Sequence, residues 1–328
     1  MKKFFEVLRE NLVIIIIFSL FLFVETFELD YSVYSPGGLI NVDQRIDNRP
    51  YNSKGSFNLT YVAYRKGTLA NLLIAKILPT HDIVKNDDIT YSNEDIIDMN
   101  KRDAIAIKEA VSNATYIAYK YANAKLTVVD ENLYIYFVSP LADTELKVGD
   151  QVIKCDDKDI NTLEEMTQCT SSKNVGDTVK MQVIRNNKLI DVDSKIIDFE
   201  GTNIVGLIVT RILDYEKDPN LEYQYSSSEG GSSGGLLLSL SLYNSLIEED
   251  ITKGRKIAGT GTIELDGTVG EISGIQYKLA GAAKNKVDLF IVPEGNYEEA
   301  ENVIKEKHYN IKLLKASTFE QVINDLKN

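Results

Sequence analysis

The sequence predicts a chain of the α/β (α+β) class that carries a separate β-rich domain and a helical N-terminal segment. Three observations lead to this prediction. Strand-like and helix-like segments alternate over residues 199–328, which is typical of layered α/β domains. Short runs of β-branched and aromatic residues follow one another over residues 126–198, and an apolar run lies near the N-terminus. With 328 residues, 44% of them apolar, the chain is long enough for two or three domains with real cores.

The apolar run extends from Leu12 to Val24. Basic residues precede it and acidic residues follow it, namely Lys2, Lys3 and Arg9 before and Glu25, Glu28 and Asp30 after. Counted strictly, the run is short for a membrane span and would also suit the core of a cleaved signal peptide. No small-x-small cleavage site follows, however, and including Phe27 and Leu29 lengthens the segment. We therefore expect residues 1–30 to form a cytoplasmic tip and an uncleaved transmembrane helix, with membrane contact from Leu12 to Leu29 and the bulk of the chain extracytoplasmic at the cell membrane.

Residues 31–125 are expected to form a membrane-proximal segment of strands and helix. We predict a turn over Tyr34–Gly38, a strand over Phe57–Tyr64 and a helix over Glu94–Ala124, where apolar residues recur at helical spacing. No motif for chemistry is present in this segment. Its expected role is to pack against the C-terminal domain or to set the distance of that domain from the bilayer.

Residues 126–198 carry the pattern of short strands around a helix. Strands are predicted at Leu133–Val138 and Val179–Arg185, a Gly149-Asp150 turn precedes another strand, and Leu163–Thr167 suits a helix. This order resembles a PDZ domain, which binds an extended peptide at a sheet edge. The Gly-Leu-Gly-Phe type loop that holds a peptide carboxylate is not evident, so a β-rich spacer that binds nothing is the alternative. Cys155 and Cys169 are expected to be buried thiols, although a disulfide is chemically permitted outside the cell.

The C-terminal part, residues 199–328, holds the candidate reactive residues. After an expected strand at Ile204–Val209, the loop Gly230-Gly231-Ser232-Ser233-Gly234-Gly235 enters an almost wholly apolar run, Leu236 to Ile247, which predicts a buried helix. Unpaired backbone N–H groups and the helix dipole would favour an oxyanion beside Ser233. A helix-capping serine in an ordinary loop is the simpler alternative. A phosphate-binding loop is disfavoured because no lysine follows the glycines.

A lysine further along the chain supplies a candidate base. Asp266-Gly267 predicts a hairpin turn, and Ser273 with Gln276 predicts a capping box that opens a helix. Lys278 falls at the margin of the apolar stripe of this helix, whereas Lys284 points to the opposite side. A lysine that loses hydration has a lowered pKa, and its neutral amine can act as a general base toward a serine hydroxyl. The alternative is a lysine whose stem is packed and whose amine stays in water.

These two motifs together resemble the Ser/Lys proteolytic domain of the Lon family, and the whole chain resembles the membrane-anchored PDZ-containing Lon-like serine proteases. The resemblance implies that Ser233 is the nucleophile, Lys278 the general base and Thr260 a residue near the active site. Gly231, Ser232 and Gly234 complete the serine motif. Three positions depart from the family pattern: Ser232 replaces a proline, Gly234 replaces an alanine, and Ser273 replaces the first glycine before the lysine helix. The first two changes make the serine loop more flexible.

Composition excludes several other functions. The net charge of -13 disfavours binding of nucleic acid. His81 and His308, the two histidines of the sequence, form no zinc motif, so no metal or other cofactor is expected. We therefore expect an ATP-independent serine endopeptidase that cleaves peptides or flexible protein segments, selected partly by the PDZ domain, with homo-oligomerisation possible. The alternative is a catalytically impaired PDZ scaffold or adaptor at the membrane.

Overall fold

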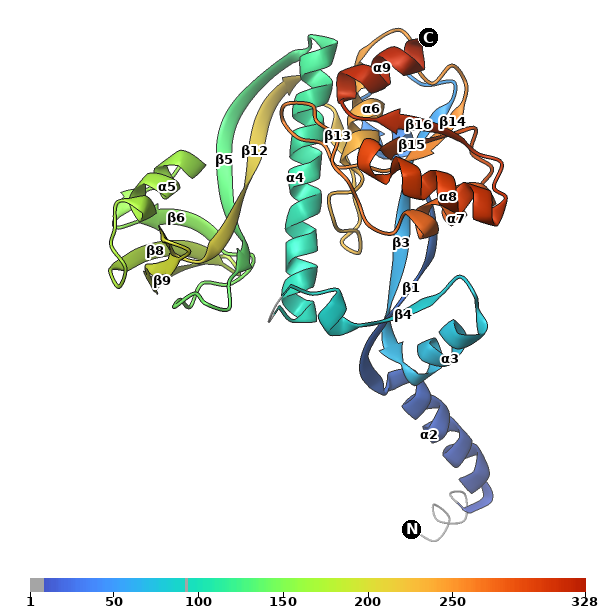
Figure 1. The fold of residues 1–328 in the computed structure, drawn as a ribbon, viewed down its shortest axis with the longest axis horizontal. Helices are drawn as coiled ribbons and strands as arrows, with labels where there is room; N and C mark the ends of the chain where they lie inside the picture. Colours follow the sequence, from blue (N-terminus) through green and yellow to red (C-terminus); the bar gives the residue numbers. More distant parts are fainter. Residues whose placement is uncertain (1–8, 92–93) are drawn as a thin grey trace.

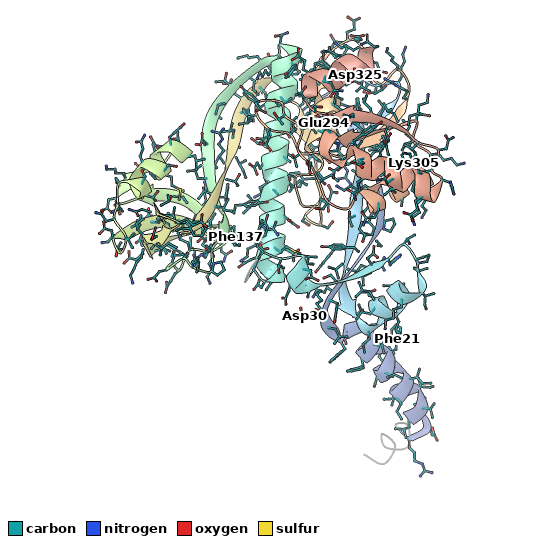
Figure 2. The ribbon with its side chains drawn as sticks, in the orientation of Figure 1. Phe21, Asp30, Phe137, Glu294, Lys305 and Asp325 are labelled. Carbon is teal, nitrogen blue, oxygen red and sulfur yellow. A yellow bond between two sulfur atoms is a disulfide. The ribbon has the colours of Figure 1, made fainter. Side chains whose placement is uncertain are left out.

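A computed structural model describes residues 9–91 and 94–328, so the predicted cytoplasmic tip with Lys2 and Lys3 lies outside the described residues (Figure 1). The apolar N-terminal run forms helix α2, Leu12–Thr26, which has no buried residue. Within the described ranges, no helix combines the length and the apolar character that crossing a membrane requires. Helix α2 projects from the rest of the chain, and Figure 2 shows Phe21 on it.

One six-stranded sheet joins the N-terminal segment to the C-terminal third of the chain. Its strands lie in the order β16-β15-β14-β3-β1-β4. Their bounds are β1 Glu28–Asn41, β3 Ser56–Thr68, β4 Asp82–Lys85, β14 Lys256–Gly259, β15 Leu289–Pro293 and β16 Lys312–Ala316. β3 pairs antiparallel with β1 and parallel with β14, so the first strands of the chain complete the sheet that carries the candidate site. The predicted strand at Phe57–Tyr64 is confirmed within β3.

The predicted turn at Tyr34–Gly38 is wrong, because these residues lie inside β1. The pairing of β1 with β3 shifts register between Pro36 and Leu39, so the Pro-Gly-Gly sequence forms an irregularity in a continuous strand. Gly37 allows this close approach, since a Cβ atom there would lie 2.3 Å from the carbonyl oxygen of Tyr61.

Helices cover this sheet and build its core. They are α3 Leu69–Ile77, α4 Ile96–Ala122, α6 Gly235–Leu246, α7 Ile275–Lys284, α8 Tyr297–Lys307 and α9 Phe319–Lys327, with short 3-10 turns η1 Asp43–Arg45, η2 Asn86–Asp88 and η3 Glu294–Asn296. The predicted buried helix is confirmed as α6, in which every residue from Gly235 to Ser245 is buried. Its apolar side chains pack with Phe57 of β3 and with Ile117 of α4 in the main core.

The β-rich domain forms a second sheet in the order β12-β5-β6-β8-β9. The elements are β5 Lys125–Val138, β6 Gln151–Cys155, β7 Lys158–Asp159, α5 Leu163–Ser171, β8 Thr178–Arg185, β9 Lys188–Lys195 and β12 Leu207–Asp218. One small pair, β10 Ile197–Phe199 with β11 Thr202–Ile204, lies between β9 and β12 in sequence, and another, β2 Ile46–Asp47 with β13 Glu222–Tyr223, packs at the main core. The strand expected to open the third domain instead belongs here, because β12 pairs with β5 from Leu207 opposite Val138 to Asp218 opposite Lys125.

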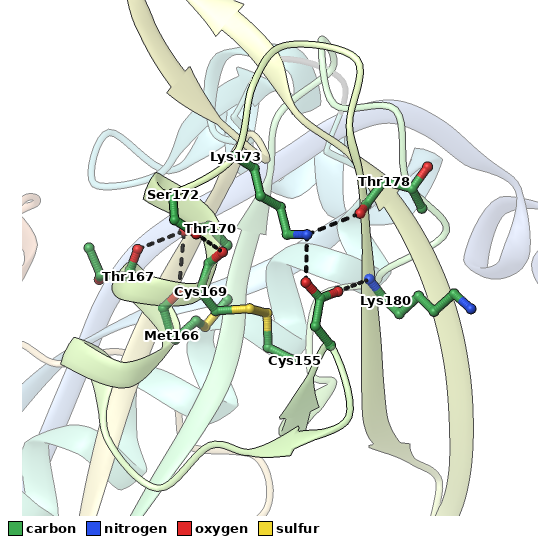
Figure 3. The surroundings of a disulfide bond; sticks show 10 residues. Cys155, Met166, Thr167, Cys169, Thr170, Ser172, Lys173, Thr178 and Lys180 are labelled. Carbon is green, nitrogen blue, oxygen red and sulfur yellow. Dashed lines mark hydrogen bonds and ion pairs between the residues drawn. A yellow bond between two sulfur atoms is a disulfide. The ribbon is translucent and has the colours of Figure 1, made fainter.

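The two cysteines of this domain form a disulfide, so the expectation of two buried thiols is wrong (Figure 3). Cys155 ends β6 and Cys169 lies on α5, and the Cα atoms of the two residues are 6.4 Å apart. This separation lies in the range that a disulfide bridges. Spacing in the sequence could not show it, because the approach depends on how α5 packs over the sheet.

Candidate active site

Ser233 lies in the loop immediately before α6, and contacts on both of its sides fix that loop. The backbone N–H of Gly231 donates to the carbonyl of Asp103 on α4 at 2.8 Å, and Gly261 N–H donates to the carbonyl of Ser233 at 2.8 Å. Glu229 pairs with Arg45 at 2.5 Å. Gly231 has φ +85°, a left-handed conformation that favours glycine. The side chain of Ser233 is only half-buried and borders a cavity, so a substrate can reach it.

Lys278 is buried on α7, with 3% of its surface exposed. The sequence placed it only at the margin of the apolar stripe. Burial lowers the pKa of its amine from 10.5 to about 7. A substantial fraction of this amine is therefore neutral near pH 7, which a solvated lysine does not achieve.

Thr260 connects the lysine to the serine loop. The Nζ atom of Lys278 donates to the hydroxyl of Thr260 at 2.8 Å, and this hydroxyl donates to the carbonyl oxygen of Ser233 at 3.0 Å. The backbone adds a second link, because the N–H of Gly261 also donates to the carbonyl of Ser233. Thr260 thus joins the Lys278 amine to the backbone of Ser233, whereas among the described residues no hydrogen bond connects this amine to the Ser233 hydroxyl.

The entry to the lysine helix differs from the prediction. The expected capping box of Ser273 and Gln276 is wrong, because α7 begins after Gly274, which has φ +75°, and no side chain caps the helix. A Cβ atom at Gly274 would lie 2.9 Å from the Val62 side chain on β3, so glycine serves both the backbone conformation and the packing. This close approach of α7 to β3 carries Lys278 into the interior.

The turn at Asp266-Gly267 forms, but no strand flanks it in the described structure. Gly267 N–H donates to the carbonyl of Glu264, and Phe319 N–H at the start of α9 donates to the carbonyl of Gly267. The turn is therefore hydrogen-bonded to the start of α9, and these contacts take the place of those that a regular hairpin would form.

Two backbone donors beside the serine hydroxyl are available. In the described parts of the chain, neither Ser233 N–H nor Gly234 N–H has a hydrogen-bond acceptor within the protein, whereas Gly235 N–H donates to Ser232 and Leu236 N–H to Gly261. Both free donors precede the first turn of α6, where the helix dipole is positive. This arrangement suits a developing negative charge on a carbonyl oxygen.

The glycine at position 234 has a structural explanation. A Cβ atom there would approach the side chain of Leu59 to 3.0 Å. Leu59 lies on β3, so this strand occupies the space that an alanine side chain would need. The serine motif therefore has glycine in place of the family's alanine at a position where the side chain of Leu59 occupies the space of the alanine methyl group.

A cavity of about 370 Å³ opens beside Ser233. Parts of the chain far apart in sequence line it, chiefly β3, α4 and the serine loop, together with the paired Arg45 and Glu229. Most of the wall is apolar, and its apolar members are Ile40, Leu59, Val62, Ile107, Ala110, Val111 and Leu238. Sequence reasoning missed these residues because their pattern signals only burial. No group of three or more His, Cys, Asp or Glu residues is placed to hold a metal ion within the described ranges.

Comparisons with known proteins agree with this arrangement. Residues 97–196 match the PDZ domain family, and residues 226–327 match the Lon protease (S16) C-terminal proteolytic domain. Among solved structures, the PDZ domain of an SdrC-like protein from Listeria innocua is 28% identical, covers 24% of this chain and 92% of its own, and has a TM-score of 0.23. The corresponding domain from Listeria monocytogenes is 31% identical, covers 25% of this chain and 92% of its own, and also has a TM-score of 0.23. No curated protein matches. The chain thus combines a PDZ domain with a Lon protease proteolytic domain, the combination on which its similarity to the PDZ-containing Lon-like proteases rests.

Proposed function

We propose that this protease is a serine endopeptidase in which Ser233 is the nucleophile and Lys278 the general base. The observation that carries the proposal is the hydroxyl of Thr260, which accepts from the Lys278 amine and donates to the carbonyl of Ser233. A buried amine with a pKa of about 7 is thus linked through Thr260 to the backbone of Ser233, whose side chain borders the cavity.

In the proposed reaction, the neutral amine of Lys278 takes the proton of the Ser233 hydroxyl as the oxygen attacks the peptide carbonyl carbon. The N–H groups of Ser233 and Gly234 stabilise the oxyanion of the tetrahedral intermediate. The ammonium then gives its proton to the leaving amine, and the C–N bond breaks to leave an acyl ester on Ser233. Lys278 next activates a water molecule, which hydrolyses the ester and restores the serine hydroxyl.

The proposed substrates are flexible polypeptides. The sequence has no Gly-x-x-x-x-Gly-Lys-Ser/Thr motif for nucleotide phosphates, so this chain is proposed to act without ATP-driven unfolding. An extended segment reaches Ser233 with an apolar side chain in the neighbouring cavity, whose walls favour burial of apolar surface. The PDZ domain contributes selection of the peptide.

The dyad is tested with an activated-serine probe and with an unstructured protein substrate. A fluorophosphonate should label the full chain, and Ser233→Ala should abolish both labelling and cleavage. Lys278→Ala should abolish cleavage while the chain stays folded. Ser232→Ala is the matched control, because it removes the adjacent hydroxyl and should leave both probe labelling and substrate cleavage unchanged. If the unmodified chain takes up no probe and cleaves nothing, the scaffold alternative replaces the protease assignment.

We further propose that α2 anchors the protein in a membrane and that the remaining domains lie outside the cytoplasm. Helix α2 has no buried residue, and its side chains are almost entirely apolar. Acidic residues follow it, and the disulfide Cys155–Cys169 suits an oxidising compartment. Proteinase K added to intact spheroplasts should digest the PDZ and protease domains. Protection of both domains until the membrane is lysed would reject this orientation.

A further inference from the structure

A second apolar surface lies beside α2. On α3, Leu73, Ile74 and Ile77 expose 58%, 44% and 78% of their surface, and the next residue, Leu78, exposes 41%. The spacing of these residues puts them on one face of the helix, while Ala75 on another face is buried. Ile83 on β4 is also exposed. We call these five residues, Leu73, Ile74, Ile77, Leu78 and Ile83, the α3 patch.

Helix α3 begins beside the residue that follows α2. The backbone N–H of Leu69, the first residue of α3, donates to the carbonyl of Phe27 directly after α2, at 3.3 Å. Phe27 directly after α2 and Leu29 on β1 are 44% and 39% exposed. Figure 1 shows α2 and α3 together at one end of the molecule, with the PDZ domain and the C-terminal helices away from them. Exposed apolar side chains therefore occur on α2, on the residues that follow it and on the neighbouring α3.

We propose that the α3 patch lies in the lipid interface of the bilayer that α2 enters. This inference rests on the proposed membrane anchoring by α2 and adds a second point of attachment. The 15 residues of α2 amount to about 22 Å of helix, less than a hydrocarbon core of about 30 Å. The adjoining apolar surface at Phe27, Leu29 and α3 extends the region that lipid can cover. Lys76 and Lys85 are exposed near the patch and can reach the headgroups.

Two attachment points would fix the orientation of the protease domain, whereas one helix would leave it free to pivot. β3 provides a direct connection, because Thr68 at its end caps α3 and Val62 lines the cavity beside Ser233. Six residues of extended strand separate Thr68 from Val62, a length of about 20 Å. The cavity is thus held at a defined distance from the lipid surface, within reach of polypeptide segments that emerge from the same membrane.

The sequence contains no tryptophan, so a single introduced tryptophan reports lipid contact without background. Ile77→Trp on α3 is the test variant. Ile16→Trp on α2 reports insertion of the anchor, and Leu189→Trp is the matched control, because Leu189 is 63% exposed on β9 of the PDZ domain. Each full-length variant is reconstituted in phosphatidylcholine vesicles with brominated acyl chains, and in vesicles that also contain phosphatidylglycerol.

We expect Ile77→Trp to show blue-shifted emission and to lose most of its fluorescence to the brominated lipid in both vesicle types. Leu189→Trp should keep the emission of a solvated tryptophan. If Ile16→Trp is quenched and Ile77→Trp is not, the anchor stands and the proposal for the α3 patch is overturned. If neither is quenched, both proposals fail. Quenching of Ile77→Trp only with phosphatidylglycerol would show electrostatic adsorption and would overturn apolar insertion.

Discussion

Replacing Lys278 by methionine should make the protein inactive and yet more stable. Burial lowers the pKa of this amine from 10.5 to about 7. The charged amine is therefore less stable in the folded chain than in the unfolded chain, where water solvates it. Each pKa unit corresponds to about 1.4 kcal/mol, which gives a penalty of roughly 5 kcal/mol as an upper limit. Methionine keeps an unbranched apolar side chain of similar length without this penalty.

The sign of the pH dependence follows from proton binding. Below pH 7, Lys278 is protonated in both states, and the full penalty lowers the free energy of unfolding. Between about pH 7 and 10.5, the unfolded chain binds a proton that the folded chain does not, so stability rises with pH. Above 10.5 the penalty is gone. The gain from Lys278→Met should therefore be largest at pH 6 and should shrink steadily above pH 7.

Urea unfolding at pH 6, 8 and 10 measures this difference. Lys284→Met is the matched control, because Lys284 is exposed on the same helix and its replacement should change stability little at any of these pH values. In parallel, the kcat/KM of the unmodified enzyme should rise about tenfold per pH unit below 7 and level off above it. Equal stability changes in the two variants, or loss of stability in Lys278→Met at pH 6, would refute the burial of a depressed amine.

Three further predictions concern the site and the PDZ domain. Thr260→Val removes the acceptor of the lysine amine and should lower kcat by about 10- to 100-fold, while Thr260→Ser should restore most of it in the same peptide assay. The double variant Cys155→Ala/Cys169→Ala should lose about 3 kcal/mol in PDZ unfolding, with no change in cleavage of an unstructured peptide. Gly234→Ala should slow cleavage by crowding Leu59, and adding Leu59→Val should recover the rate; an unchanged rate in the single variant would contradict the crowding.

Local sequence patterns sufficed where one short segment determines the structure. The apolar run after Gly235 has no polar face, so it predicts a buried helix, and α6 confirms it. The spacing of apolar residues around Lys278 predicts a helix with the lysine near its apolar side. These patterns locate the two candidate catalytic residues, because glycine loops and helix faces are encoded by neighbours in sequence.

Features that depend on contacts between distant segments could not be predicted from the sequence. The Pro-Gly-Gly sequence in β1 has the composition of a turn, yet pairing with β3 keeps it extended. The helix opening at Gly274 depends on Val62, more than 200 positions away. The disulfide likewise depends on the packing of α5 over β6. In each case a tertiary neighbour overrides the local preference, and no single window of sequence contains both partners.

The placement of α4 gives the two domains a common element. Figure 1 shows this helix between the β5–β12 pair of the PDZ domain and the protease domain. On its first turns, Arg102 binds Glu94 at 2.8 Å and lies 6.0 Å from the ring of Tyr136 on β5. The next residue, Asp103, accepts the N–H of Gly231 in the serine loop. Helix α4 therefore contacts β5 through Arg102 and the loop that carries Ser233 through Asp103, so one rigid element physically connects the two domains.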